Sequence, residues 1–406
     1  MLTDSVVEGP LPHTFRKVWD ELAPIGRDGR TGGYLRYAFT EPEQQLRDWF
    51  RGQAADRGMP VESDGNGNLF AWWGDPAAGD AVLTGSHFDS VPQGGAYDGP
   101  LGIVSAFLAV DELRRQGVTP SRPLGVVAFA EEEGGRFGVP CLGSRLLTGA
   151  LDPARAAALT DRDGVRLADA FGGVPAGARP DLVARFGAFV ELHVEQGRAL
   201  VEQDSAVAVA SVIWPHGRWR LDFTGEGNHA GTTRMADRRD PMLTFAHTVL
   251  AANRQARRHG AHATVGRVRV EPNATNAIPS QVTGWLDARA AEPETLDRLV
   301  AAVHAEAVER AQADGTGLTV TEESATPLVG FDAGLTGRLR DLLDVPVLPT
   351  GAGHDAGVLA GLVPTAMLFV RNPTGVSHSP AESASDADCA AGVVALARVL
   401  EELTCR

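Results

Sequence analysis

Residues 124–135 read LGVVAFAEEEGG, an unbroken apolar run that ends in three carboxylates and two glycines. Such a run is typical of a strand that is buried on both faces, as in a parallel sheet. Residues 81–90 (AVLTGSHFDS) and 188–197 (AFVELHVEQG) repeat the design, with a histidine near the end of each apolar run. Because open α/β sheets bind ligands at the carboxyl ends of their strands, these segments predict a functional site where the strands end.

Helical patterns alternate with these strands. Residues 39–58 form a helical pattern that Gly58 ends, and residues 101–117 carry apolar side chains three and four positions apart. The pattern of an apolar strand followed by a polar loop returns at 345–357 and 364–372. The alternation predicts an α/β fold in which helices cover a mostly parallel sheet.

The segment from residue 212 to residue 325 has a different pattern. Half-exposed strand patterns are found at 218–227, 263–272 and 281–290. Two amphipathic helical patterns are found at 241–258 and 294–312. One face of the first helix is expected to carry Met242, Phe245, Ala246, Val249 and Leu250. These patterns predict an inserted α+β lid or dimerisation domain at 212–325, and a catalytic metal-binding domain formed by 1–211 and 326–406.

Composition limits the classes of partner. The chain has 406 residues, a net charge of -15 and three cysteines. Its length favours two domains, and an acidic surface repels phosphate backbones and anionic lipids, so we expect neither nucleic acid nor membrane partners. The cysteines lack zinc-ligand spacing, and the first residues lack a basic stretch followed by an apolar one. We therefore expect a cytoplasmic protein without a signal peptide.

The polar segments at the predicted strand ends supply one set of metal-ligand side chains. The candidates are His87, Asp98, Glu132 or Glu133, His193 and His378. Imidazoles with carboxylates suit zinc, manganese, cobalt or nickel, and five or more ligands favour two ions about 3.5–4 Å apart. A run of glutamates is usually a solvated surface, but unpaired carboxylates at the end of a buried strand are costly, which favours cations as their partners. Six further histidines are interpreted as ordinary polar residues: His13, His216, His247, His259, His262 and His304.

The same motifs, in this order, resemble the carbamoylase and allantoate amidohydrolase branch of the dinuclear metallopeptidase-like hydrolases. The resemblance runs nearly end to end. It is carried by GSHFDSVPQGGAYDG (85–99), EEEGGRF (131–137), ELHVEQG (191–197), GEGNHAGTTRM (225–235), PNATNAIP (272–279), GAGHDA (351–356) and SHSPAE (377–382). Arg234, where relatives often carry proline, departs from the pattern and leaves the substrate's identity open.

The resemblance implies a role for each metal-site residue. Asp98 would bridge two divalent ions, His87 and His193 would hold one of them, and Glu133 and His378 would hold the other. Glu132 would be the general base that accepts a proton from the attacking water. Adjacent residues of a strand point in opposite directions, so this division of roles requires a local bend. Two alternatives are that Glu131 replaces Glu133 and that Glu132 only orients a ligand.

The resemblance also implies substrate contacts. His229 would stabilise the oxyanion from the other subunit of a homodimer, and its alternative role is that of a turn residue. Asn276 and Arg289 would bind the substrate carboxylate, although Arg289 could be an ordinary surface arginine. Gln196 would bind the ureido end of the substrate, and Glu382 would lie near His378. His354 and Asp355 would belong to the site periphery. Asp355 could instead start the following helix as its cap.

The implied activity is hydrolysis of a carbamoyl or ureido carbon–nitrogen bond in a small carboxylate substrate. Two substrates fit, allantoate and an N-carbamoyl-L-amino acid, and residues 26–40 favour allantoate slightly. The alternative is an aminoacylase or dipeptidase of the same superfamily. Gln196 favours a ureido group over an acyl chain.

Overall fold

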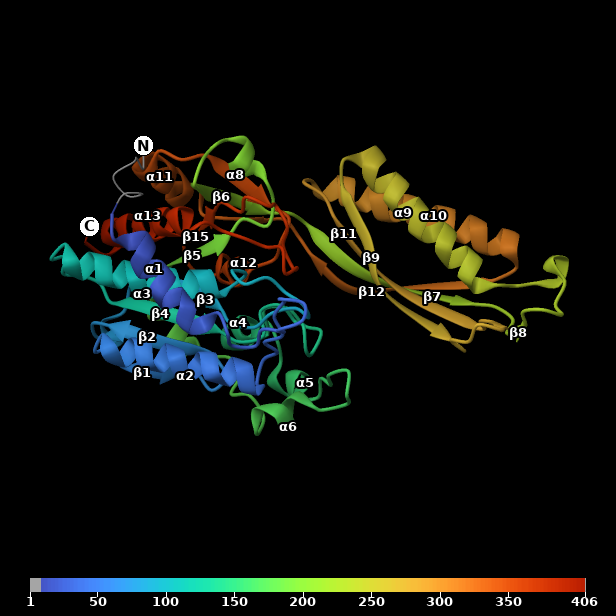
Figure 1. Cartoon of the computed structure of the whole chain (residues 1–406), viewed down its shortest axis with the longest axis horizontal. Coiled ribbons are helices and arrows are strands. Elements are labelled where there is room, and N and C mark those ends of the chain that lie inside the picture. The colour runs from blue at the N-terminus through green and yellow to red at the C-terminus, as the bar shows by residue number, and fades with distance from the viewer. Residues whose placement is uncertain (1–8, 406) are drawn as a thin grey trace. The chain divides into compact units, whose positions relative to one another are not determined.

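The computed structural model describes residues 9–405, which form two compact units (Figure 1). Unit 1 contains the chain up to Ser211 and from Gly330 onward, and unit 2 is Val212–Val329. Residues 1–8, for which the sequence predicts no signal peptide, and Arg406 lie outside the described residues. Within residues 9–405, no helix is long and apolar enough to cross a membrane.

Unit 1 is built on a nine-stranded sheet in the order β1-β2-β4-β3-β5-β15-β6-β13, with β14 paired to β6. Its centre, β4-β3-β5-β15, is parallel, and antiparallel pairs flank this centre. The strands are β1 Val61–Ser63, β2 Leu69–Trp73, β3 Ala81–His87, β4 Leu124–Phe129, β5 Phe186–Val194, β6 Val207–Ile213, β13 Val329–Gly330, β14 Val347–Thr350 and β15 Thr365–Val370.

Helices cover both faces of this sheet. Every residue of β3, β4 and β15 is buried, which is expected only where both faces are covered. The helices of unit 1 are α1 Leu11–Leu22, α2 Glu41–Asp56, α3 Pro100–Arg115, α4 Leu142–Thr148, α5 Pro153–Ala157, α6 Leu167–Phe171, α7 Pro180–Val183, α8 Ala199–Glu202, α11 Ala333–Leu343, α12 Asp355–Leu359 and α13 Asp386–Cys405. The predicted fold class is confirmed.

Unit 2 contains a four-stranded antiparallel sheet in the order β12-β7-β11-β9, with two long helices packed on one face (Figure 1). Burial alternates along β7, as expected for a sheet with one covered face. The elements are β7 His216–Thr224, α9 Pro241–His259, β9 His262–Glu271, β11 Gln281–Arg289, α10 Pro293–Asp314 and β12 Gly317–Thr326. A two-stranded ribbon, β8 Asn228–His229 with β10 Ala277–Ile278, adjoins this sheet.

The apolar face expected for α9 is only partly covered. Met242 and Phe245 pack against the core of unit 2, whereas the side chain of Leu250 is 65% exposed. The helix also buries Thr244, Thr248, Ala251 and Ala252. Small side chains on this face allow α9 to approach α10 closely, and the apolar periodicity of the sequence does not reveal which face the neighbouring helix selects.

Candidate metal centre and catalytic site

Asp98 is the centre of a buried cluster in unit 1. Its Oδ1 lies 3.6 Å from His87 Nε2 and 3.2 Å from His193 Nε2. Its Oδ2 lies 3.3 Å from His378 Nε2, which in turn lies 3.4 Å from Glu133 Oε1. Two ligand triplets therefore share one carboxylate, and each triplet is compact enough to hold an ion.

The sheet brings these side chains together. His87 is the last residue of β3 and His193 lies near the end of β5, which runs parallel to it. Asp98 comes two residues before α3, and Glu133 follows β4. His378 lies in the loop after β15. The carboxyl ends of neighbouring parallel strands meet at one edge, so residues far apart in sequence converge there.

Backbone carbonyls fix the tautomers of two histidines. His87 Nδ1 lies 3.0 Å from the Asp89 carbonyl oxygen, and His193 Nδ1 lies 2.9 Å from that of Val194. A carbonyl can only accept, so both Nδ1 atoms carry a hydrogen, and in the neutral ring each Nε2 presents a lone pair to Asp98.

Several ligand atoms in the cluster are buried without a hydrogen-bond partner among the described residues. These atoms are His87 Nε2, His193 Nε2 and Glu133 Oε1. Unpartnered buried polar atoms are rare and costly. Nitrogen and carboxylate donors that converge in this way fit divalent cations such as zinc or manganese.

A bend after β4 separates the roles of three consecutive glutamates. Glu131 has φ of 52°, and its Oε1 accepts hydrogen bonds from the amides of Arg136 and Phe137. Glu133 faces His378, whereas Glu132 Oε2 lies 3.7 Å from His87 Nε2. Glu133 rather than Glu131 therefore lies with the second ligand triplet.

Asp89 holds this bend, and the sequence interpretation missed it. Its carboxylate accepts hydrogen bonds from the amides of Glu132 and Glu133, at 3.0 and 3.1 Å. Asp89 is 2% exposed and lies two residues after His87. A carboxylate only two residues after the predicted ligand His87 is a sequence signal that could have identified Asp89.

Burial and the close spacing of charged groups shift the pKa values of side chains in the cluster. Burial raises the pKa of Glu132 well above its ordinary value, with added repulsion from Asp355 and Glu133. Burial, together with Asp98, raises the pKa of Glu133 to about 7. Burial alone would lower the pKa of His378, but Asp98 and Glu133 raise it to about 9. A carboxyl group with a raised pKa and no strong donor is suited to proton transfer.

Glu382 supports Asp98 from behind. Its carboxylate accepts hydrogen bonds from the Tyr97 and Asp98 amides, at 2.7 and 3.0 Å, and from the Ser377 hydroxyl at 3.1 Å. Gln196 Nε2 donates to Asp98 Oδ2 at 2.9 Å, on the side that faces His378.

His354 lies deeper than the expected site periphery. It is 3% exposed, and its ring centroid is 4.6 Å from that of His193. Asp355, the first residue of α12, accepts a hydrogen bond from the Ser144 hydroxyl at 2.5 Å. Asp355 does start α12, but the N-cap position belongs to His354, so Asp355 is not the cap of the helix.

The substrate-contact candidates of unit 2 fall into two places. His229 lies in β8, and the amide of Ala230 donates to the Asn276 carbonyl, so His229 and Asn276 are neighbours. Arg289 is the last residue of β11 and pairs with Asp287 through Nε and Nη2, at 2.7 and 3.0 Å. In the sheet, Arg289 pairs with His216 at one end of β11. The β8–β10 ribbon, which carries His229, adjoins the other end, where Gln281 pairs with Thr224.

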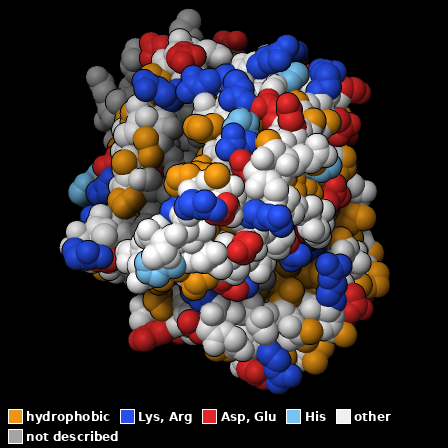
Figure 2. All heavy atoms as spheres, turned by 90° about the vertical axis from the view of Figure 1, so that its right-hand side faces the viewer, with side chains coloured by type: hydrophobic (Ala, Val, Ile, Leu, Met, Phe, Trp, Pro, Cys, Tyr) orange, Lys and Arg blue, Asp and Glu red, His pale blue; other side chains and the backbone are white. Residues whose placement is uncertain are grey.

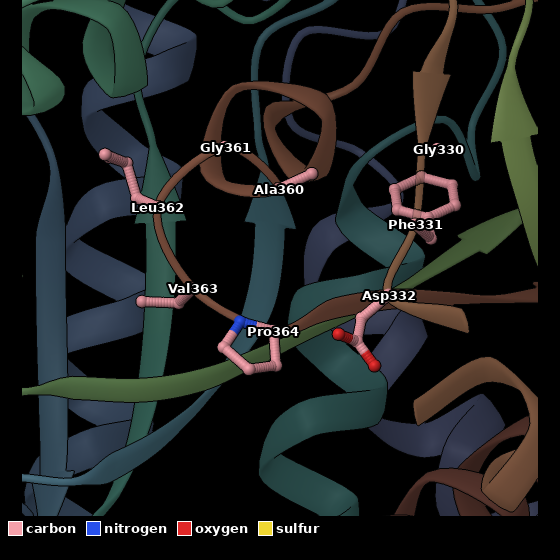
Figure 3. Close-up of a pocket in the computed structure, with 8 residues that line it drawn as sticks. All are labelled: Gly330, Phe331, Asp332, Ala360, Gly361, Leu362, Val363 and Pro364. Atoms are coloured by element: carbon pink, nitrogen blue, oxygen red, sulfur yellow. The ribbon is translucent and has the colours of Figure 1, made fainter. Parts of the chain in front are cut away.

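A separate pocket in unit 1 lacks such chemistry (Figure 3). It is lined by Gly330, Phe331, Asp332, Ala360, Gly361, Leu362, Val363 and Pro364. Asp332 is its one ionisable side chain, and that carboxylate caps α11 by accepting from the Leu335 amide. The Asp98 cluster is therefore the better candidate for a catalytic site.

Comparison with known families agrees with this geometry. The sequence profile of peptidase family M20/M25/M40 matches residues 83–402. The chain belongs to peptidase family M20/M25/M40. M20 enzymes are metal-dependent, and the described residues of this chain hold side chains that could bind metal. Two of the groups share Asp98, and a third, buried group is Glu191, His193 and His354.

Similar M20 proteins match over almost their whole length. An N-carbamoyl-L-amino acid amidohydrolase of Geobacillus stearothermophilus is 35% identical, over 95% of this chain and 98% of the relative. An allantoate amidohydrolase of Escherichia coli is 33% identical, over 96% and 98%. The crystal structure of a hydantoinase/carbamoylase family amidase from Burkholderia vietnamiensis superposes with a TM-score of 0.90 at 30% identity, over 97% and 98%.

Proposed function

We propose that this enzyme hydrolyses the ureido or carbamoyl carbon–nitrogen bond of a small carboxylate, releasing ammonia and carbon dioxide. The substrate is allantoate or an N-carbamoyl-L-amino acid, as the names of the two relatives suggest. An aminoacylase or dipeptidase activity is not favoured, because the relatives that match end to end are amidohydrolases. The three free thiols fit the reducing cytoplasm, where we place the enzyme.

One observation carries the proposal: each oxygen of Asp98 faces a different set of ligands. We assign His87, Asp98 and His193 to one divalent ion, and Asp98, Glu133 and His378 to the other. Zinc, manganese, cobalt and nickel all accept such ligands. When bound, the ions lower the pKa of the attacking water and polarise the substrate carbonyl.

Glu132 then acts as the general base. It takes a proton from water and returns it to the leaving nitrogen, so one carboxylate serves both steps. Its burial supports this role, because a desolvated carboxylate is a stronger base than one in water.

His229 stabilises the oxyanion. Its Nδ1 accepts hydrogen bonds from the Gly231 and Thr232 amides, at 2.9 and 3.2 Å. The neutral ring must then carry its hydrogen on Nε2, which makes Nε2 the donor that a developing negative charge requires.

Arg289 and Asn276 bind the substrate carboxylate. The ion pair with Asp287 fixes the plane of the Arg289 guanidinium at the end of β11, which favours planar recognition of a carboxylate. Gln196 binds the ureido end, where an amide can both donate and accept. His354 lines the inner wall beside His193.

We further propose that the active enzyme is a homodimer with composite sites. Gln281, near the ribbon, and Arg289 are eight positions apart, a span of about 27 Å along the strand. A small substrate cannot reach across that span, so His229 and Asn276 of one subunit serve the Arg289 of the other. The edge strand β9 and the exposed side chains of Leu243, Leu250 and Val268 are available for subunit contact. On the face shown in Figure 2, apolar side chains lie among mixed charges.

A substrate panel tests the proposal. Purified enzyme loaded with manganese, zinc or cobalt is assayed for ammonia release from allantoate, N-carbamoyl-L-amino acids and N-acyl amino acids. We expect turnover of one ureido class and none of the acyl compounds. Glu132→Gln should retain metal and lose activity by at least about 100-fold. Absence of turnover on every ureido compound would refute the proposal.

A further inference from the structure

The thiol of Cys141 lies against the side chain assigned as general base. Its Sγ is 3.5 Å from Glu132 Oε1, within the range of a sulfur hydrogen bond. The other carboxylate oxygen, Oε2, faces His87. Cys141 is buried, as Glu132 is. The two oxygens of Glu132 therefore face different partners, a thiol and the ligand cluster.

Backbone hydrogen bonds fix the position of this thiol. The Cys141 amide donates to the Glu132 carbonyl at 2.7 Å, and the Leu142 amide donates to the Glu131 carbonyl at 3.0 Å. The Gly143 amide donates to the Ala130 carbonyl at 2.9 Å. Three consecutive amides thus tie the start of α4 to the glutamate bend, and they hold the backbone of Cys141 beside that of Glu132.

The backbone of Cys141 is in the left-handed region, with φ of 54° and ψ of 37°. Glycine adopts this conformation at lower cost than any residue with a Cβ. A side chain held in this region points to a function for that side chain. The acidic group that the Cys141 side chain contacts is Glu132.

We propose that Cys141 is a positioning residue: its thiol donates a hydrogen bond to Glu132 Oε1 and thereby turns Oε2 towards the ligand cluster. The inference rests on the proposed role of Glu132 as base. A thiol is a weak donor, so it orients the carboxylate while stabilising the anion only slightly, which preserves the basicity of Glu132. Burial, with repulsion from Glu132, raises the pKa of the Cys141 thiol, which keeps its proton on sulfur.

Infrared spectroscopy tests the contact without an activity assay. Cys389→Ala/Cys405→Ala leaves Cys141 as the one thiol of the chain, so its S–H stretching band can be assigned. In that metal-free protein, Glu132→Ala should move the band to higher wavenumber, because the thiol loses its acceptor. An unchanged band would show that no hydrogen bond exists and would overturn the inference.

Kinetics test the consequence. Cys141→Ala should lower kcat about tenfold with KM and metal content unchanged, since only the orientation of the base is lost. Cys141→Ser retains a donor and should stay within threefold of the wild-type kcat, while Cys389→Ala, a buried thiol in α13, serves as control. Wild-type kcat in Cys141→Ala, no rescue by serine, or a loss that follows metal content would each overturn the inference. If the unmodified enzyme hydrolyses no ureido compound, the proposed function fails separately, and the infrared shift still decides the contact.

Discussion

His229 and Arg289 belong to the same unit but lie at opposite ends of its sheet. Arg289 pairs in register with His216, whereas Thr224, at the other end of β7, pairs with Gln281, and the ribbon that carries His229 follows from there. A ureido substrate is far shorter than the intervening strand. If both residues act on one substrate molecule, they come from two chains.

Subunit mixing tests this division. Homodimers of His229→Ala and of Glu132→Gln should each be inactive. In a heterodimer of the two, one site combines an intact Glu132 with the partner's intact His229, so an equal mixture should recover about one quarter of wild-type activity. Ammonia release by the mixture provides the measurement. Heterodimers purified from it through two different tags carry one complete site of two and should reach about half of wild-type activity per dimer.

A matched pair controls that experiment. His229→Ala mixed with Asn276→Ala should not recover activity, because both residues are donated from the same side of the interface and neither site of the heterodimer is complete. Inactivity of the first heterodimer would place His229 and Glu132 of one site on a single chain. Recovery in the control would place His229 and Asn276 of one site on different chains.

The support behind Asp98 gives a second prediction. A Cβ at Gly95 would overlap the Glu382 carboxyl group, which holds the Tyr97 and Asp98 amides. Gly95→Ala should therefore displace Asp98 and weaken metal affinity about 10- to 100-fold. Competition with a chelator measures that affinity.

Gly52→Ala is the control for Gly95→Ala. Gly52 lies in α2, and a Cβ there meets no atom within 4 Å. This variant should keep metal affinity and gain about 0.5–1 kcal/mol of stability, because alanine is the better helix former. Equal metal affinities in the two variants would argue against a role for Glu382 in holding Asp98.

Much of this site follows from the sequence because its ligands come where apolar strands end. His87 and His193 lie at or near the ends of buried apolar runs, a pattern typical of central strands. These two strands are parallel neighbours in the sheet, so their carboxyl ends lie side by side. The sequence could not decide between Glu131 and Glu133. That choice depends on φ of 52° at Glu131, a conformation for which glutamate has no preference.

Other features depend on contacts that local patterns do not encode. The partner of Cys141 is Glu132, nine residues away across a tight loop, and the sequence interpretation assigned no function to that cysteine. The sequence did not reveal that α9 also buries small residues such as Thr244 and Thr248, because they do not form an apolar stripe. The Asp287–Arg289 pair was missed, although a spacing of two on a strand places both side chains on one face.

Metal stoichiometry gives a third prediction. Because Asp98 belongs to both ligand triplets, Asp98→Ala should lose both ions, whereas His378→Ala should keep the ion held by His87 and His193. Elemental analysis after dialysis should find about zero ions per chain in Asp98→Ala and about one ion per chain in His378→Ala. Equal metal contents in the two variants would contradict a shared carboxylate.

Proton release on metal binding gives the last prediction. In the metal-free protein the pKa of His378 is raised to about 9 and that of Glu133 to about 7, so near pH 7 His378 is protonated and Glu133 is partly so. An ion binds only the neutral imidazole and the ionised carboxylate, so binding must displace these protons. Metal affinity should therefore rise as pH increases from 6 to about 9, with His378→Ala releasing fewer protons than wild type. Calorimetric titration in two buffers of different ionisation enthalpy counts the protons, and an affinity independent of pH across that window would show that these two groups do not bind the ion.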